Sequence, residues 1–236
     1  MEDHKSKFDN FTCDSYNKQY LSEGPLYQLL YTVLEKCLDD TNSMLEVGSG
    51  PNAPATYFMN KISKKKIDYT LCEPSKSAKE LDKLKDVVKE PSTVTILNEP
   101  ADSEKLKEKG KHDLVVANRM IHEWRLFEVS SGREWTVKKA VELLLSLCNE
   151  KGKVIIADFS FCDEYENLKD DDPKMIEDRD ILAKRIGHSH PPREYIKLRE
   201  IKEAALEIGA KVELEHIIEK PEPDTHRIYW MCIIKH

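Results

Sequence analysis

Two glycines and an acidic residue follow one another closely at the end of a short apolar run. Glu46 stands two residues before Gly48-Ser-Gly50. Glycine lets the backbone turn tightly and lets a ligand approach the exposed N–H groups. Residues 48–53 also satisfy the dinucleotide pattern with Ala53 in its last position, a pattern that more than one cofactor class shares. The segment therefore predicts a ligand-binding turn and leaves the cofactor class open.

A second acidic residue refines the cofactor class. Glu73 lies 25 residues after Gly48 and follows the apolar run 67–72. A carboxylate there can accept hydrogen bonds from both ribose hydroxyls and would repel a 2′-phosphate. Glu46 is costly on a buried strand unless it receives hydrogen bonds or faces a cation, and it would also repel a pyrophosphate. Both carboxylates favour an adenosine-type cofactor.

A third group of polar side chains follows the apolar run 113–117. His122 can remove a substrate proton near neutral pH, and the competing interpretation is a histidine that only packs or hydrogen-bonds. Glu123 and Asp158 can hold a cationic amine; alternatively they are a helix N-terminal charge and a strand-end cap. If the reaction is a direct displacement, it depends on aligning the two reactants and needs no catalytic motif. His122 and Glu123 are therefore catalytic candidates although they form no known motif.

Alternating strands and helices must position these residues. Such alternation predicts a doubly wound, mostly parallel α/β sheet in a Rossmann-like three-layer sandwich, in which the carboxyl ends of strands converge on one crevice. The last two strands have no helix between them, so they must pair antiparallel, unlike a dehydrogenase half-domain. The expected strands are 43–47, 67–72, 93–97, 113–117, 154–158, 211–218 and 227–234, and the expected helices are 25–39, 53–62, 75–88, 103–109, 135–148 and 193–208.

The alternation also predicts the domain organisation. Residues 1–40 are expected to form an N-terminal arm and helix, and residues 41–236 one domain with a lid-like insertion at about 159–192. His188 and His190 within the insertion would share one face of an extended segment, but no third ligand accompanies them, so no metal site is predicted.

The amino-acid composition limits the classes of molecule that the protein is expected to bind and the compartment in which it is expected to lie. The net charge of −7 disfavours a broad nucleic-acid surface, and a small or cationic substrate fits better. Six cysteines without a Cys-x-x-Cys pair fit neither a zinc framework nor a disulfide scaffold. No apolar run approaches the ~20 residues that cross a bilayer, and residues 1–14 lack the apolar core of a signal peptide. We therefore expect a cytoplasmic protein with no membrane span.

Three of these segments resemble the class I S-adenosylmethionine-dependent methyltransferases: Leu45-Glu-Val-Gly-Ser-Gly50, Cys72-Glu-Pro-Ser75, and the strand and turn from Asp113 to Trp124. The resemblance covers about residues 40–236. It implies a seven-stranded sheet in the order 3-2-1-4-5-7-6 and S-adenosyl-L-methionine as the cofactor.

The resemblance also implies where the cofactor lies. Gly48 and Gly50 would flank its methionine part, Glu46 would support the turn or the amino group, and Glu73 would hold the ribose. Asn118 would lie beside the methionine carboxylate or sulfonium. The segment 98–102 would border adenine, although the acidic residue that usually follows strand three directly is absent. The implied cofactor-binding residues are Glu46, Gly48, Ser49, Gly50, Glu73, Pro74, Asn98, Glu99, Asn118 and Arg119, with Asn98 and Glu99 preferred over Ala101.

The prediction is therefore a methyltransferase that acts on a small molecule by direct displacement, with the acceptor enclosed by the N-terminal arm and the insertion. The alternatives are a methyltransferase acting on protein or RNA and a non-catalytic methyltransferase-like subunit that binds a protein partner. A nicotinamide dehydrogenase is disfavoured by Glu46 and by the final hairpin. The acceptor atom and the oligomeric state stay open.

Overall fold

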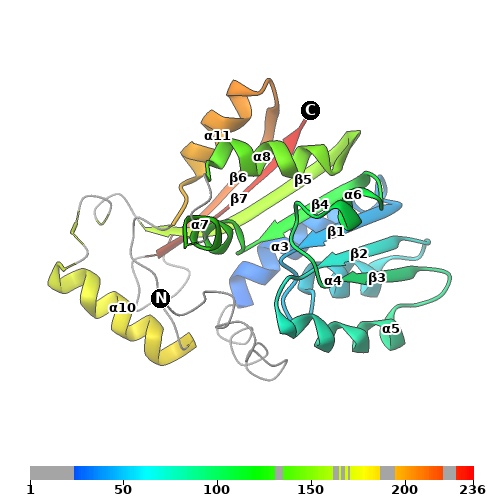
Figure 1. Ribbon diagram of the computed structural model, residues 1–236, viewed down its shortest axis with the longest axis horizontal. Helices are drawn as coiled ribbons and strands as arrows, with labels where there is room; N and C mark the ends of the chain where they lie inside the picture. The colour runs from blue at the N-terminus through cyan, green and yellow to red at the C-terminus, as the bar shows by residue number, and fades with distance from the viewer. Residues whose placement is uncertain are drawn as a thin grey trace.

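The computed structural model describes residues 24–130, 135–161, 165, 168–169, 171–186, 195–219 and 227–236. These residues build a seven-stranded sheet in the order β3-β2-β1-β4-β5-β7-β6, with helices on both faces (Figure 1). The predicted α/β fold class and strand order are thereby confirmed.

All strand pairs are parallel except those that involve β7. The antiparallel hairpin expected from the short final connection is confirmed, because β7 lies between β5 and β6 and runs against both. The strands are β1 (Ser43–Val47), β2 (Asp68–Cys72), β3 (Thr93–Leu97), β4 (His112–Asn118), β5 (Cys148–Phe161), β6 (Lys211–Glu219) and β7 (Arg227–Lys235).

Alternate residues of the central strands enter two separate cores, as the period of two along a strand requires. On β4, Leu114 and Val116 join one cluster, whereas Val115 and Ala117 join the other. The first cluster packs under α3 (Gly24–Cys37) and α4 (Pro54–Ile62), and the second under α8 (Val137–Ser146) and α11 (Leu198–Glu207). Both faces of the sheet are therefore covered, which explains why most side chains of its central strands are apolar.

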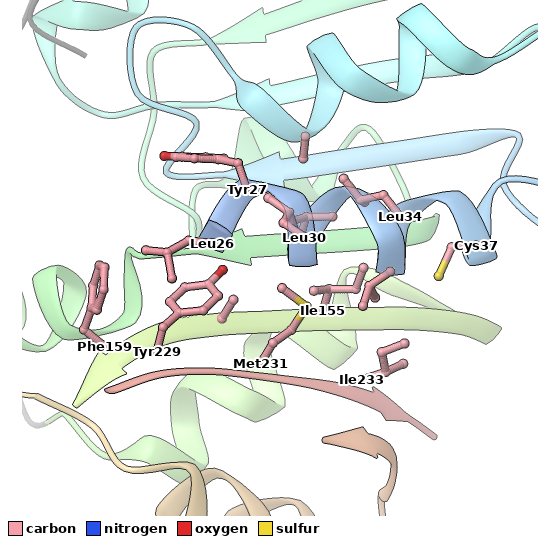
Figure 2. Packing of buried hydrophobic residues seen from close by; sticks show 14 of the residues in the cluster. Leu26, Tyr27, Leu30, Leu34, Cys37, Ile155, Phe159, Tyr229, Met231 and Ile233 are labelled. Carbon is pink, nitrogen blue, oxygen red and sulfur yellow. The ribbon is translucent and has the colours of Figure 1, made fainter. Parts of the chain in front are cut away.

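Helix α3 precedes the first strand and packs, with α4, on the face of the sheet that carries Leu114 and Val116. Figure 2 shows Leu26, Leu30 and Leu34 of this helix in one packed layer with Ile155 and Met231. The apolar residues recur at helical spacing, which buries one face of α3 against strands that come more than a hundred residues later. The hydroxyl of Tyr27, near the start of α3, thereby lies 2.8 Å from Nη1 of Arg119, which directly follows β4.

The helix expected over 75–88 has nearly the predicted bounds but another geometry: it is a 3₁₀-helix, η1 (Lys76–Lys83), capped by the Ser75 hydroxyl and followed by the short α5 (Leu84–Val87). Other predicted boundaries are wrong. The helix expected over 193–208 begins only at Leu198. Strand β5 is also longer than predicted: it begins at Cys148 and continues to Phe161, whose backbone pairs with Arg227. Residues 159–161 therefore belong to the sheet and not to the insertion.

Three further helices are α6 (Glu104–Lys107), α7 (Ile121–Ser130) and α10 (Pro173–Ile186). Of the cysteines, Cys37, Cys72, Cys148 and Cys232 are buried free thiols, and Cys13 and Cys162 lie outside the described residues. The N-terminal arm, His188 and His190 also lie outside them. In the part of the chain that the structure describes, no helix is long and apolar enough to span a membrane.

Candidate functional site

The glycine turn between β1 and α4 holds an unusual backbone. Gly48 and Gly50 have φ angles of 62° and 59°, and Ala53 joins them at 40°, so three of six residues are left-handed. A Cβ on Gly48 would also lie 2.7 Å from Cβ of Met120, in the turn that follows β4. Two independent reasons therefore favour glycine at position 48: the positive φ angle and the close approach of the neighbouring turn.

Glu46 lies on β1 with its side chain facing the start of α4. Its Oε1 accepts the N–H of Ala55 at 3.2 Å, and its Oε2 accepts the N–H of Thr56 at 2.8 Å. The side chain is buried, and this burial raises the pKa of Glu46 to about 7, against the lowering effect of the two N–H bonds. The first N–H groups of α4, which would otherwise attract an anion, are thus already occupied by a carboxylate.

Glu73 joins the glycine turn to the loop after β2. Its Oε2 accepts the N–H of Gly50 at 2.8 Å and its Oε1 accepts the N–H of Ser75 at 2.9 Å. The residue is 6% exposed. Ser49 in the same turn is buried, and its hydroxyl has no hydrogen-bond partner among the described residues. The Glu73 carboxylate and the Ser49 hydroxyl therefore belong to the segments at the carboxyl ends of β2 and β1, which the bond from Gly50 to Glu73 joins.

The residues predicted to border adenine have protein partners. The side-chain amide of Asn98 donates to the carbonyl oxygens of Glu73 at 2.9 Å and Ser75 at 2.6 Å. Glu99 forms an ion pair with Lys105, and its carbonyl lies 3.0 Å from Sγ of Cys72. Asn98 is thus part of the same hydrogen-bonded cluster as Glu73, whereas the side chain of Glu99 turns to α6.

Asn118 and Arg119 end β4 at the same edge of the sheet. The hydroxyl of Tyr229 donates to Oδ1 of Asn118 at 3.0 Å. Arg119 has a φ angle of 57°, its N–H donates to the carbonyl of Ala157, and its Nη1 donates to the hydroxyl of Tyr27 at 2.8 Å. A non-glycine residue held in the left-handed region is costly and is found disproportionately at functional sites.

His122 lies in the first turn of α7 between two carboxylates. Nδ1 lies 2.6 Å from Oδ1 of Asp158 in β5, and Nε2 lies 3.3 Å from Oε1 of Glu123. Burial lowers the pKa of His122, but the charges of Asp158 and Glu123 outweigh it and raise the pKa to about 10. The side chain of Glu123 is 15% exposed, against 8% for His122 and none for Asp158.

Aromatic and cationic residues surround this histidine. Tyr195, which precedes α11, stacks on the His122 ring with centroids 5.3 Å apart. Arg227, the first residue of β7, lies 4.1 Å from the ring centroid of Phe159 and bonds the hydroxyl of Tyr195. Sequence reasoning missed Tyr27, Tyr195, Arg227 and Tyr229, because each enters from an element far along the chain and belongs to no local motif.

Except for the side chain of Glu99, the candidate residues lie along one edge of the sheet. They belong to β1, to the carboxyl ends of β1, β2, β3 and β4 with the segments that follow, and to the beginning of α7, which lies beside this edge (Figure 1). Among the described residues, no group of three or more His, Cys, Asp or Glu side chains is arranged to hold a metal ion.

Sequence comparisons give no relative: no protein-family model matches the chain, and no curated protein matches it either. Similarity appears only in three dimensions. An O-methyltransferase family protein from Burkholderia thailandensis superposes with a TM-score of 0.61 at 12% identity, over 99% of this chain and 62% of that protein. The chain thus spans less than two thirds of that neighbour's length.

Two further structures superpose in the same way. The cyclopropane synthase MmaA2 from Mycobacterium tuberculosis gives a TM-score of 0.60 at 10% identity, over 86% of this chain and 83% of that one. The plantazolicin methyltransferase BamL gives 0.56 at 12% identity, over 93% and 88%. At these identities the likeness shows the fold alone, and that fold is the one of the class I methyltransferases.

Proposed function

From the class I methyltransferase fold and the site at its crevice, we propose that this chain is an S-adenosylmethionine-dependent methyltransferase that acts on a small molecule by direct displacement. The single observation that supports this best is the position of Glu46. Its carboxylate covers the first N–H groups of α4, where a dinucleotide would place its pyrophosphate. A cationic sulfonium nucleoside suits this edge, and an anionic dinucleotide does not.

The other residues of the crevice fit the same cofactor. The unpartnered hydroxyl of Ser49 and the left-handed turn at Gly48 and Gly50 offer a polar, closely approachable backbone beside the two carboxylates. Glu73 has one backbone N–H on each oxygen, and a carboxylate oxygen can accept a further bond, so it can receive ribose hydroxyls. Bound S-adenosylmethionine supplies an electrophilic methyl group. The protein has to exclude water and align the acceptor with it.

On the acceptor side, we assign the proton-accepting role to Glu123 and a positioning role to His122. With a pKa of about 10, the imidazole is protonated at neutral pH and is no base by itself. Of the two carboxylates that contact the imidazole, Glu123 at Nε2 is more exposed than Asp158, which holds the ring at Nδ1. Glu123 can therefore take the proton of a hydroxyl or amine acceptor, while His122 holds the carboxylate in place through the contact of 3.3 Å.

Asn118 and Arg119 stand next to each other at the carboxyl end of β4. Arg119 is fixed by Tyr27 of α3 and lies 5.4 Å from the ring centroid of Phe159. A guanidinium held in this way can pair with the carboxylate of the cofactor's methionine part. One of the solved structures with a similar fold supports a small acceptor: the BamL structure contains S-adenosylhomocysteine (SAH) and a triazolic desmethylPZN analog.

Calorimetric titration with SAH and separately with NAD tests the cofactor class. We expect binding of SAH and none of NAD; tight binding of NAD without binding of SAH would overturn the proposal.

Incubation of a cell extract with the protein and methyl-labelled S-adenosylmethionine, followed by separation by size, tests the acceptor class. Label is expected in the small-molecule fraction. Label in protein or RNA would favour the macromolecular alternative, and SAH binding without any transfer would favour a non-catalytic subunit.

A further inference from the structure

The side chain of Asn98 connects the end of β3 to the loop that carries Glu73. An Asn amide group has two N–H bonds. In this structure the amide nitrogen of Asn98 donates to the carbonyl of Glu73 at 2.9 Å and to that of Ser75 at 2.6 Å. Both donors are thus used within the protein, on two carbonyl groups of one loop.

Glu73 continues the connection to the glycine turn. Its backbone N–H donates to Leu97 at the end of β3, and its carboxylate accepts the N–H groups of Ser75 and Gly50. Asn98 therefore holds the main chain on both sides of residue 74, and the carboxylate carried by that main chain holds the turn after β1. Three strand ends are linked through one buried acidic side chain.

We propose that Asn98 is a positioning residue for Glu73: it holds the loop so that the Glu73 carboxylate keeps its place against Gly50, and it does not recognise adenine. This inference rests on the proposed function, in which Glu73 receives the cofactor's ribose. The physical reason is preorganisation. A carboxylate on a loop without this support would have to be ordered when ligand binds, which weakens affinity although no ligand contact is lost.

A double-mutant cycle separates the two roles. SAH affinity is measured by calorimetry for the wild type, Asn98→Ala, Glu73→Gln and the double variant. Loss of the two bonds in Asn98→Ala is expected to weaken binding about tenfold. If Asn98 acts through Glu73, the double variant binds about as weakly as Glu73→Gln alone. Additive losses would mean that Asn98 contributes independently, as an adenine contact would, and would overturn the inference.

A second measurement needs no ligand. Hydrogen exchange of the Gly50 and Ser75 amides, followed by NMR, reports directly on the bonds to Glu73. Both amides should exchange faster in Asn98→Ala and in the nearly isosteric Asn98→Asp, which removes the donors without opening a cavity. Unchanged protection in Asn98→Asp would overturn the inference even if Asn98→Ala fails to fold.

Asn149→Ala is the matched control. Its amide donates to Oδ1 of Asp113 at 2.8 Å, at the opposite end of the strands. This variant should leave both SAH affinity and the Gly50 amide unchanged. Failure of this inference can be told apart from failure of the proposed function. If the wild type does not bind SAH, the methyltransferase assignment is wrong. If the wild type and the Asn98 variants bind SAH with equal affinity, only the role of Asn98 is wrong.

Discussion

Replacement of Glu46 by Gln tests the electrostatics of the glycine turn. The carboxylate is buried and accepts the N–H groups of Ala55 and Thr56 at the start of α4. Gln keeps a carbonyl acceptor of nearly the same shape for one of these bonds and carries no charge at any pH. The variant therefore removes the ionisation of residue 46 at the cost of one N–H bond, and the loss of that bond is the same at every pH.

The size of the effect follows from the pKa of Glu46, which burial raises from 4.5 to about 7. Each pKa unit corresponds to about 1.4 kcal/mol, so ionisation in the folded state is disfavoured by about 3 kcal/mol. Because the folded pKa lies above the unfolded one, the stabilisation from this group is fully present below pH 4.5 and is lost as the pH rises through 7. The Gln variant should gain stability relative to the wild type over this interval.

Urea denaturation of both proteins at about pH 5 and pH 8 measures this change. We expect the difference in unfolding free energy between wild type and Glu46→Gln to move by about 2–3 kcal/mol toward the variant at the higher pH. Glu142→Gln, at an exposed position of α8, is the control and should show no such movement. A difference that stays constant between the two pH values would refute the reasoning, because it would mean that the carboxylate ionises as easily as in water.

Three further outcomes are expected. Gly48→Ala should lower stability by about 1–3 kcal/mol in chemical denaturation, since the new Cβ meets Cβ of Met120 at 2.7 Å; Met120→Ala should not restore it, because that Cβ remains. His122→Gln should lower stability by about 3 kcal/mol at pH 7, because Asp158 and Glu123 lose the charge between them; an unchanged melting temperature would contradict this. The folded pKa of His122 lies above its unfolded value of 6.5, so its stabilisation is complete below that pH and is lost as the pH rises through about 10; melting curves of wild type and variant should therefore converge toward pH 10.5, and parallel curves would argue against an imidazolium.

The fold was predictable to a large extent because its signals are local. The runs Ser43–Val47 and Thr93–Leu97 are bounded by turn residues, and both strands have the predicted limits. The hairpin followed from the short link before the last strand. The end of β5 was decided by pairing across the sheet: β5 continues to Phe161 because β7 is present there to receive its hydrogen bonds.

By itself, the sequence determined the strands, most of the helices, their order along the chain and the acidic residues at the strand ends, since periodicity and turn residues act over a few positions. Only the tertiary structure decided what those residues do. Glu73 reaches the N–H of Gly50 across 23 residues, His122 reaches Asp158 across 36, and Arg119 reaches Tyr27 across 92. Such partners are chosen by how strands and helices pack, and a pattern confined to neighbouring residues carries no information about that choice.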